Sequence, residues 1–336
     1  MRILVTGGAG YIGSHTCLVL LEHGFDVSVL DNFSNSSEES LRRVCSISGK
    51  EIKIYRGDIR DKNTIDYILS KDRYDSVIHF AGLKSVSESV TKPLSYYDVN
   101  FNGTLVLLDA MYRHNVCDFI FSSSATVYGE PVRLPLDEQC PTGGSTNPYG
   151  ASKYFTEEML KSFSSAHPSF HITILRYFNP IGAHESGLLG ESPNGIPNNL
   201  LPYLTNVAIG KLDELKVYGG NYNTPDGTGV RDYIHVMDLA DGHLAAVLSG
   251  RTSGCDIYNL GTGKGYSVFD VINEFEYITG TSLKYRVVER RAGDVGAVWS
   301  DPTLAKNKLK WEAKRDLRKM ISDAWRWQVN NPLGYN

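Results

Sequence analysis

The N-terminal stretch constrains the fold of this chain more than any other segment. Residues 2–6 form a short apolar run, typical of a buried parallel strand, and a helical pattern begins soon afterwards. Between them lie Gly7, Gly8, Gly10 and Gly13. Gly7 permits a tight turn, Gly10 lets backbone approach a pyrophosphate, and Gly13 lets the helix pack on the strand. The spacing G-x-x-G-x-x-G departs from the commoner G-x-G-x-x-G, but strand, turn and helix together predict a phosphate group at the helix N-terminus.

Apolar runs and helical patterns alternate along the first half of the chain. We predict further strands over residues 26–30, 52–55, 77–80, 119–121 and 172–175, and helices that include residues 94–113 and 149–167. With the N-terminal strand, this alternation predicts an α/β fold built on a Rossmann-type doubly wound parallel sheet of six strands. Ligands of such sheets bind at the carboxyl ends of the strands.

The pattern changes after residue 179, where prolines, glycines and asparagines mark an irregular region. Shorter elements follow. We predict helices near 200–209, 236–245, 267–279 and 316–328, and strands at 215–218, 230–235 and 283–288. The chain is therefore expected to divide into a Rossmann domain, residues 1–178, and a smaller mixed α/β lobe, residues 179–336, that binds the substrate.

The composition limits the classes of partner. The chain has 336 residues, of which 41% are hydrophobic and 21% charged, as is ordinary for a globular protein in water. A formal net charge of −4 gives no reason to expect nucleic acid as a partner, and no stretch has the ~20 apolar residues of a membrane span. The five cysteines are scattered, and no His or Cys spacing suggests a metal site. We expect a cytoplasmic protein without a bound metal.

Polar and small residues follow the predicted strands where a cofactor would lie. Asp31 ends the second strand, where a carboxylate can accept hydrogen bonds from both ribose hydroxyls of NAD and would repel the 2′-phosphate of NADP. A turn or helix-capping role is the alternative for this residue. Asp58, after the third strand, could accept a hydrogen bond from the adenine amino group. The small residues Ala81 and Gly82 would let their loop pass close beneath a cofactor.

Tyr149 and Lys153 lie one turn apart on a predicted helix. A nearby ammonium favours the phenolate and lowers its pKa, so the two residues could form a base with electrostatic support. Lowering a tyrosine pKa by ~3 units requires about 4 kcal/mol, which one ammonium and a cationic cofactor ring together could supply. Taken alone, the motif is weak and is more typical of a surface pair of side chains. Ser124, at the end of the fifth predicted strand, could join this set or cap a turn.

Longer blocks of sequence resemble the extended short-chain dehydrogenase/reductase superfamily and, more narrowly, the UDP-glucose (UDP-galactose) 4-epimerase family. The resemblance runs the length of the chain. Its blocks are TGGAGYIGSHT at 6–16, DN at 31–32, GDIRD at 57–61, HFAGLK at 79–84, FSSSATVYG at 121–129, YGASK at 149–153, RYFNPIGAH at 176–184, GIPNNL at 195–200 and DGTGVRDYIHVMDLADGH at 226–243.

The resemblance implies roles for individual residues. The implied catalytic residues are Ser124, Tyr149 and Lys153. The implied NAD contacts, besides Tyr149, Lys153 and the glycine turn, are Tyr11, Ile12, Asp31, Asn32, Asp58, Ile59, Phe80, Ala81, Gly82, Lys84 and Phe178. The implied nucleotide-sugar contacts, besides Ser124, are Asn179, Asn199, Tyr218, Arg231, Arg291 and Asp294. Some family members have asparagine where this chain has Val99, and the flanking Asn100 and Asn102 could take over a contact to NAD.

The resemblance also implies a mechanism. Tyr149, as a phenolate, would remove the proton from the sugar 4-hydroxyl while C4 gives its hydride to a tightly held NAD. Ser124 would hydrogen-bond the same oxygen, and Lys153 would keep the phenolate charged. The keto sugar would then turn, and return of the hydride would invert C4. The implied partners are a UDP-sugar and a second copy of the chain, paired through helices at 94–113 and 149–167.

Val298 bears on the size of the sugar. In the family, a tyrosine a few residues after the Arg-x-Gly-Asp motif, here residues 291–294, accompanies restriction to glucose and galactose, whereas a small residue accompanies acceptance of N-acetyl sugars. Valine therefore predicts room for an acetamido group, unless Val298 packs in the core and another residue fills the pocket. UDP-GlcNAc 4-epimerisation as the main activity is one alternative, and a non-catalytic NAD-sensing protein on the same fold is another. A 4,6-dehydratase is disfavoured because Ala125 and Thr126, rather than an acidic pair, follow Ser124.

Overall fold

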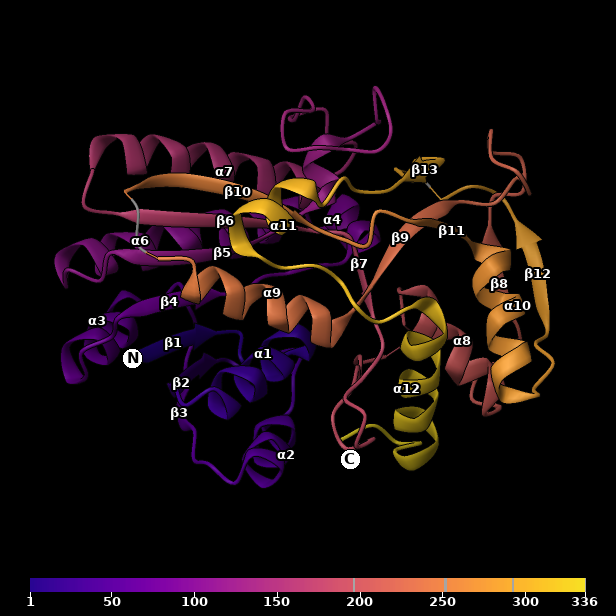
Figure 1. Cartoon of the computed structure of the whole chain (residues 1–336), viewed down its shortest axis with the longest axis horizontal. Helices are drawn as coiled ribbons and strands as arrows, with labels where there is room; N and C mark the ends of the chain where they lie inside the picture. The colour runs from indigo at the N-terminus through magenta and orange to yellow at the C-terminus, as the bar shows by residue number, and fades with distance from the viewer. Residues whose placement is uncertain (196, 251–252, 292, 336) are drawn as a thin grey trace.

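The computed structural model describes residues 1–195, 197–250, 253–291 and 293–335. One parallel sheet with helices on both faces forms the larger part of the molecule (Figure 1). Its strands lie in the order β10-β6-β5-β4-β1-β2-β3, and each neighbouring pair runs parallel. They are β1 (Arg2–Thr6), β2 (Asp26–Asp31), β3 (Lys53–Arg56), β4 (Ser76–His79), β5 (Asp118–Ser124), β6 (His171–Tyr177) and β10 (Gly254–Leu260). The predicted Rossmann-type doubly wound sheet is confirmed.

The sheet has seven strands rather than the predicted six. After the lobe begins, the chain returns along α9 (Val236–Leu248) and adds β10 at the edge of the sheet, where Tyr258 lies opposite Leu175. Polar residues, among them Asp256 and Asn259, interrupt this half-exposed edge strand, so it lacks the continuous apolar run of a central strand. The expected division at residues 178 and 179 therefore misses a segment of the second part that belongs to the sheet.

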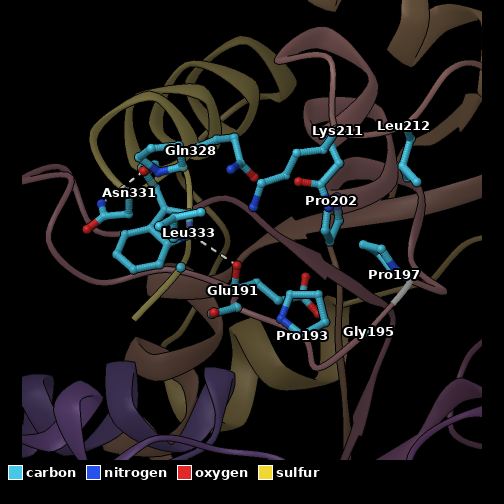
Figure 2. A pocket seen from close by; sticks show the side chains of 15 residues that line it. Glu191, Pro193, Gly195, Pro197, Pro202, Lys211, Leu212, Gln328, Asn331 and Leu333 are labelled. Atoms are coloured by element: carbon cyan, nitrogen blue, oxygen red, sulfur yellow. Dashed lines mark hydrogen bonds between the residues drawn. The ribbon is translucent and has the colours of Figure 1, made fainter. Parts of the chain in front are cut away.

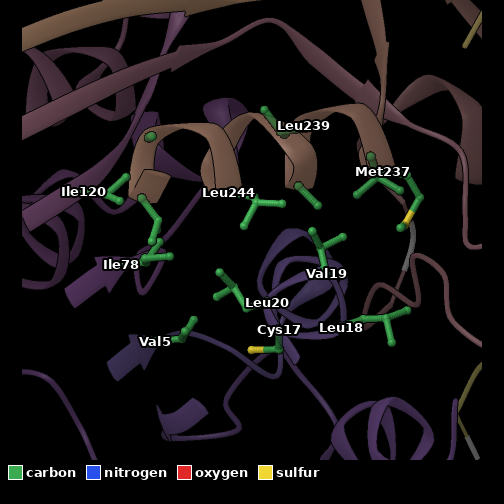
Figure 3. Close-up of a cluster of buried hydrophobic side chains, with 14 of the residues drawn as sticks. Val5, Cys17, Leu18, Val19, Leu20, Ile78, Ile120, Met237, Leu239 and Leu244 are labelled. Carbon is green, nitrogen blue, oxygen red and sulfur yellow. The ribbon is translucent and has the colours of Figure 1, made fainter. Parts of the chain in front are cut away.

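Two hydrophobic cores cover the two faces of the sheet, because successive side chains of a strand point to opposite faces. On β1, Ile3 and Val5 join one core and Leu4 joins the other. The first core includes side chains of α1 (Tyr11–Glu22), α2 (Glu38–Ser48), α9 and α11 (Thr303–Leu309), and the second those of α3 (Lys62–Lys71), α6 (Gly103–Arg113) and α7 (Pro148–Ala166). Figure 3 shows Leu244 of α9 on the side of that helix that faces Val19 and Leu20 of α1. Each such aliphatic side chain contributes about 1.5–3 kcal/mol on full burial.

The helix predicted over residues 94–113 is present, but its hydrogen bonding changes along its length. It consists of α5 (Pro93–Tyr96), a π-helical turn η1 (Tyr97–Asn102) and α6. The short helix α4 (Val86–Thr91) precedes it. Asn100, in the π-helical turn, has a buried side chain. Such turns are frequent at functional sites.

The lobe lies at one end of the sheet, on the right of Figure 1. Its larger sheet joins β7 (Asn179–Ile181), β9 (Val230–His235), β11 (Gly265–Ser267) and β13 (Ala297–Val298), and its smaller sheet pairs β8 (Leu215–Tyr218) with β12 (Tyr285–Val288). A third core lies among these strands and α8 (Leu200–Ala208), α10 (Val268–Thr279) and α12 (Leu317–Asn330). The predicted mixed α/β character of the lobe is confirmed.

No helix within the described ranges is both long and apolar enough to cross a membrane. Those ranges also contain no group of three or more His, Cys, Asp or Glu side chains that could hold a metal ion.

Candidate active site

The glycine turn after β1 is built so tightly that larger residues would not fit. Gly7 has a φ of +71°, and a β-carbon there would lie 2.6 Å from the backbone nitrogen of Ala81. A β-carbon on Gly13 would lie 2.4 Å from the carbonyl oxygen of Gly7. Gly10 precedes α1 and forms no side-chain cap, so the first N–H groups of this helix remain available to an anion. The turn therefore has the close backbone packing and the uncapped helix start that a phosphate-binding turn requires.

Asp31 both shapes this cradle and faces it. Its buried carboxylate accepts hydrogen bonds from the Ala9 backbone nitrogen at 3.0 Å, from Phe33 nitrogen at 2.8 Å and from Ser36 Oγ at 2.9 Å. The turn-residue alternative is thus realised. Two carboxylate oxygens offer about four acceptor positions, so these three hydrogen bonds leave one position for a ribose hydroxyl rather than the two that the predicted contact uses.

Asn32 and Asp58 form a second polar group beside it. Asn32 Nδ2 donates to Asp58 at 3.0 Å, and Arg60 forms an ion pair with Asp58 at 2.8 Å. The hydrogen bonds from Arg60 lower the pKa of Asp58. Asp58 is therefore ionised near neutral pH and available as an acceptor, as the predicted adenine contact requires. Arg60 is part of the GDIRD block at 57–61, but no role was predicted for it.

Asn100 holds the loop that follows β4. Its Oδ1 accepts from the Leu83 backbone nitrogen at 2.7 Å, and its Nδ2 donates to the Leu83 carbonyl and to Ser152 Oγ, each at 3.0 Å. Gly82 passes close by, since a β-carbon there would be 3.0 Å from Asn100 Oδ1. Both amide hydrogens of Asn100 are thus used within the protein. Only one lone pair of Oδ1 is left for the predicted NAD contact, so this side chain acts mainly by positioning the loop.

Ser124, Tyr149 and Lys153 come together where β5 ends beside the first turns of α7. Asn147 caps α7 by accepting from the Gly150 nitrogen at 2.9 Å. Lys153 is buried, and its Nζ donates to the Ser122 carbonyl at 2.7 Å. Ser124 Oγ accepts from both the nitrogen and the hydroxyl of Thr126, so the turn role considered for Ser124 is also real.

The electrostatics of the chain by itself differ from the expected lowering of the Tyr149 pKa. Burial raises the pKa of the Tyr149 phenol, and the Ser124 hydroxyl only partly opposes this effect. Burial also lowers the pKa of Lys153 from 10.5 to about 8, against the attraction of Glu157. The ammonium bonds to a backbone carbonyl rather than to the phenol, so the activation inferred from sequence requires a further positive charge from a ligand.

A buried network that the sequence analysis missed supports these residues. Glu157, one turn beyond Lys153, pairs with Arg176 at 2.6 Å and accepts from Ser123 Oγ at 2.5 Å. Arg176 also donates to the Tyr128 hydroxyl, which in turn donates to Asn259 Oδ1 at 2.7 Å. Two features of the sequence could have indicated this network. Glu157 follows Lys153 by four residues, and Arg176 lies inside an otherwise apolar strand.

The residues predicted to hold the nucleotide sugar gather where β9 and β13 pair. Val298 is opposite Arg231 in this pairing, and Arg231 donates to the Val295 carbonyl at 2.7 Å. Arg291 forms an ion pair with Asp294 at 3.0 Å and lies 5.3 Å from the ring centroid of Tyr218.

Two asparagines complete this set. Asn179 starts β7 beside Phe178, and Asn199 precedes α8, where its side chain donates to Glu191. The side chain of Val298 packs in a small cluster with Phe178 and Val127. Val298 thus lies between the arginine side of the site and the turn that carries Ser124.

Two hollows lie away from Ser124, Tyr149 and Lys153. One has a volume of about 220 Å³ and lies between the segment after Glu191, α8 and the C-terminal residues (Figure 2). The other has a volume of about 420 Å³ and lies over η1 and α7. Neither hollow is lined by Ser124, Tyr149 or Lys153.

Comparison with known proteins agrees with this class of site. The family described as GDP-mannose 4,6 dehydratase matches residues 4–324. A UDP-glucose 4-epimerase from Yersinia enterocolitica is 60% identical over 336 residues, with 100% of both chains covered, and one from Haemophilus influenzae is 58% identical over 336 residues, covering 100% of this chain and 99% of the relative. The crystal structure of a Bifidobacterium longum UDP-glucose 4-epimerase in complex with NAD+ and UDP superposes with a TM-score of 0.98 at 53% identity, covering 99% of this chain and 100% of that chain.

The fold and the Ser, Tyr and Lys constellation define an extended short-chain dehydrogenase/reductase. Within that superfamily, the chain belongs to the UDP-glucose 4-epimerase family.

We expect the substitution Lys153→Met to stabilise the nucleotide-free protein near pH 7 by about 1–2 kcal/mol. Burial of the ammonium destabilises the folded wild type by up to about 3 kcal/mol, and the substitution removes this cost. The substitution also removes the hydrogen bond to Ser122, which lowers the gain by about 1 kcal/mol. The pKa of Lys153 is about 8 in the folded protein and 10.5 in the unfolded chain, so the folded protein binds fewer protons between these pH values. The stability of the wild type therefore rises with pH in this range, and the stability difference between Lys153→Met and wild type shrinks.

Urea unfolding at pH 7, 8.5 and 9.5 measures this difference. Lys161→Met, on the same helix with a partly exposed side chain, is the control and should change stability by less than about 0.5 kcal/mol. A Lys153→Met protein that is less stable than wild type at every pH would contradict the expectation.

Proposed function

We propose that this protein interconverts UDP-glucose and UDP-galactose by reversible oxidation at C4 of the sugar, with NAD held in the site. The observation that carries the proposal is the convergence of Ser124, Tyr149 and Lys153 beside the glycine cradle, in a chain of the UDP-glucose 4-epimerase family. Oxidation followed by reduction at one carbon accounts for a dehydrogenase-type site in an isomerase.

The residues present fit NAD. The steric restrictions at Gly7 and Gly13, the uncapped start of α1 and the buried Asp31 carboxylate suit a pyrophosphate and a ribose. Bound NAD would accept the C4 hydride and return it. Its contacts would come from Gly10, Tyr11, Ile12, Asn32, Asp58, Ile59, Phe80, Ala81, Gly82, Lys84, Tyr149, Lys153 and Phe178.

The proton at the sugar 4-hydroxyl is handled by the chain itself. Tyr149 Oη takes this proton and later returns it, and Ser124 Oγ hydrogen-bonds the same sugar oxygen. Lys153, one turn from Tyr149, supplies a positive charge that favours the phenolate. Lys153 is buried and Tyr149 is partly exposed, so charge interactions within the site are stronger than in water mainly on the Lys153 side.

The lobe holds the nucleotide while the sugar turns. Arg231 and Arg291, the latter near Tyr218, would bind the UDP portion together with Asn179, Asn199 and Asp294. Guanidinium groups suit this task because they pair with phosphate in a bidentate manner. Firm binding at the UDP end leaves the hexose free to present its other face.

Val298 sets the space in which the hexose turns, and we propose that UDP-GlcNAc and UDP-GalNAc are also interconverted. The side chain borders Phe178 on one side and lies opposite Arg231 on the next strand. Valine has a smaller volume than tyrosine, which leaves room for an acetamido group. Paired measurements of kcat/KM for UDP-galactose and UDP-GalNAc test this proposal and also show which sugars are the main substrates.

A second copy of the chain is the proposed macromolecular partner. Phe155 of α7 is 49% exposed, Leu94 of α5 is 81% exposed, and Tyr97 and Phe101 join Phe155 around the 420 Å³ hollow. An apolar face of this kind is typical of a subunit interface. Pairing of two such faces would form a four-helix contact.

We further propose a cytoplasmic location. The five cysteines are unpaired, and Cys17 and Cys140 are buried. Such usage is typical of a reducing compartment.

Tyr149→Phe should lower kcat for UDP-galactose by at least about 10³-fold, because the phenylalanine ring has no oxygen to accept the proton of the sugar 4-hydroxyl. NAD bound per protomer, measured after denaturation of the purified protein, should stay the same. Tyr112→Phe, at an exposed position of α6, is the matched control. Undiminished turnover in Tyr149→Phe would refute the catalytic assignment, and a wild type that binds NAD without any turnover would favour an NAD-sensing role.

Val298→Tyr should lower kcat/KM for UDP-GalNAc by at least about 10-fold and leave that for UDP-galactose within about 3-fold, since only the larger sugar meets the added ring. Paired assays of both substrates measure this change. Val287→Tyr, at an exposed site of β12, controls for the substitution itself. Wild type without UDP-GalNAc turnover, or a variant that retains it, would show that Val298 does not set sugar size.

Phe155→Asp should convert the dimer into a monomer in light scattering at micromolar concentration, because two carboxylates would be buried against an apolar face. Tyr277→Asp, on the exposed side of α10, should leave the mass unchanged. A wild type with the mass of one chain would contradict the proposed partner.

A further inference from the structure

Glu191 connects one residue assigned to the cofactor with one assigned to the substrate. Its Oε1 accepts hydrogen bonds from Lys84 Nζ at 3.0 Å and from Asn199 Nδ2 at 2.9 Å. Lys84 lies in the loop after β4, and Asn199 lies at the start of α8 in the lobe. The sequence analysis assigned no role to Glu191.

The main chain at Glu191 is anchored to the C-terminal part of the molecule. Its carbonyl oxygen accepts from Trp327 Nε1 at 3.0 Å, the hydrogen bond drawn in Figure 2. The adjacent Gly190 packs against Trp327, where a β-carbon would approach to 2.3 Å, and both its nitrogen and its oxygen bond to the Tyr335 hydroxyl. The carboxylate therefore extends from a fixed point toward the two ligand-side residues.

This arrangement contributes little to stability. The side chain of Glu191 is 9% exposed, but that of Lys84 is 51% exposed, and pairs with one exposed partner are worth about 0–1 kcal/mol. In addition, Glu191 Oε2 is buried and has no hydrogen-bond partner among the described residues, which costs free energy. A buried acceptor left unpaired is better explained by function than by folding.

The surroundings of Glu191 leave it room to respond to a ligand. Glu191 lines the 220 Å³ cavity, which lies between its own segment, Pro202 of α8 and Leu333 (Figure 2). The cavity borders the residue, while the Oε2 atom itself stays buried. A side chain that joins two ligand-binding groups can shift between arrangements only if such space exists.

We propose that Glu191 is a positioning residue that couples NAD retention to nucleotide-sugar binding by holding Lys84 and Asn199 in one arrangement. The proposal rests on the proposed function, because it takes Lys84 as an NAD contact and Asn199 as a UDP contact. Coupling between two binding equilibria is reciprocal. UDP should therefore tighten the retention of NAD by the same factor by which NAD tightens the binding of UDP.

The test measures two equilibria that need no catalysis. UDP affinity is measured by calorimetry on the NAD-loaded enzyme, and NAD affinity by equilibrium dialysis with and without saturating UDP. In wild type, saturating UDP should lower the Kd of NAD at least about 5-fold, which is within the usual range of coupling between two sites. In Glu191→Ala this factor should fall below about 1.5, while kcat at saturating UDP-galactose stays within about 3-fold of wild type.

A double-mutant cycle separates positioning from a merely structural role. Lys84→Met should weaken the binding of UDP at least about 3-fold when Glu191 is present, and it should have no effect on UDP binding in the Glu191→Ala background. Glu191→Gln keeps an acceptor oxygen for Asn199 and should restore UDP affinity to within about 2-fold of wild type. Glu185→Ala, at an exposed acid in the same segment, is the control and should change neither affinity.

The outcomes distinguish this proposal from the proposed function. Equal effects of Lys84→Met in both backgrounds, or an unchanged coupling factor in Glu191→Ala, overturn the role of Glu191 while leaving the epimerase assignment intact. Normal coupling in a wild type that lacks turnover overturns the epimerase assignment alone. A wild type that binds neither NAD nor UDP overturns both.

Discussion

The site depends on one buried ion pair, that between Arg176 of β6 and Glu157 of α7. Both side chains are almost fully buried, and Ser123, Tyr128 and Asn259 extend the pair into a network. Five elements meet there: β5, β6, β10, α7 and the turn η2 (Ala125–Tyr128). Removing one partner of such a pair costs about 3–5 kcal/mol, because the other charge stays buried and uncompensated. The network therefore holds the end of β5, with Ser124, in a defined position beside Tyr149 and Lys153.

The catalytic groups are kept in that position at a cost to stability. Burial raises the pKa of Tyr149 and lowers that of Lys153, so each charged form is disfavoured in the chain alone. In the proposed mechanism, Tyr149 therefore becomes a base only with the help of ligand charges in the site. This arrangement ties the proton chemistry to an occupied site, as a reaction with a sequestered intermediate requires.

The lobe is coupled to the sheet by the path of the chain as well as by packing. The chain leaves the sheet after β6, builds part of the lobe, returns through α9 to add β10, and then completes the lobe. Movement of the lobe against the sheet is therefore restrained by covalent crossings and by the α1–α9 core. The pairing of β13 with β9 uses this rigidity to place Val298 opposite Arg231, so the residue expected to limit sugar size is aligned with a residue expected to bind the nucleotide.

Local patterns were sufficient to predict the parallel sheet and the glycine turn, because strand period and glycine requirements are properties of short segments. The Ser124, Tyr149 and Lys153 set was implied by the longer blocks that resemble a known family. Local patterns were insufficient for β10, whose half-exposed edge position leaves no apolar run, and for Arg176, Glu157 and Glu191, whose partners are distant in sequence. Local patterns also could not predict the direction in which the Tyr149 pKa is shifted, because burial depends on every element packed around the phenol. The sequence by itself determined which groups the site contains; only the tertiary structure decided which of them touch, since desolvation and long-range contacts exist only in the folded chain.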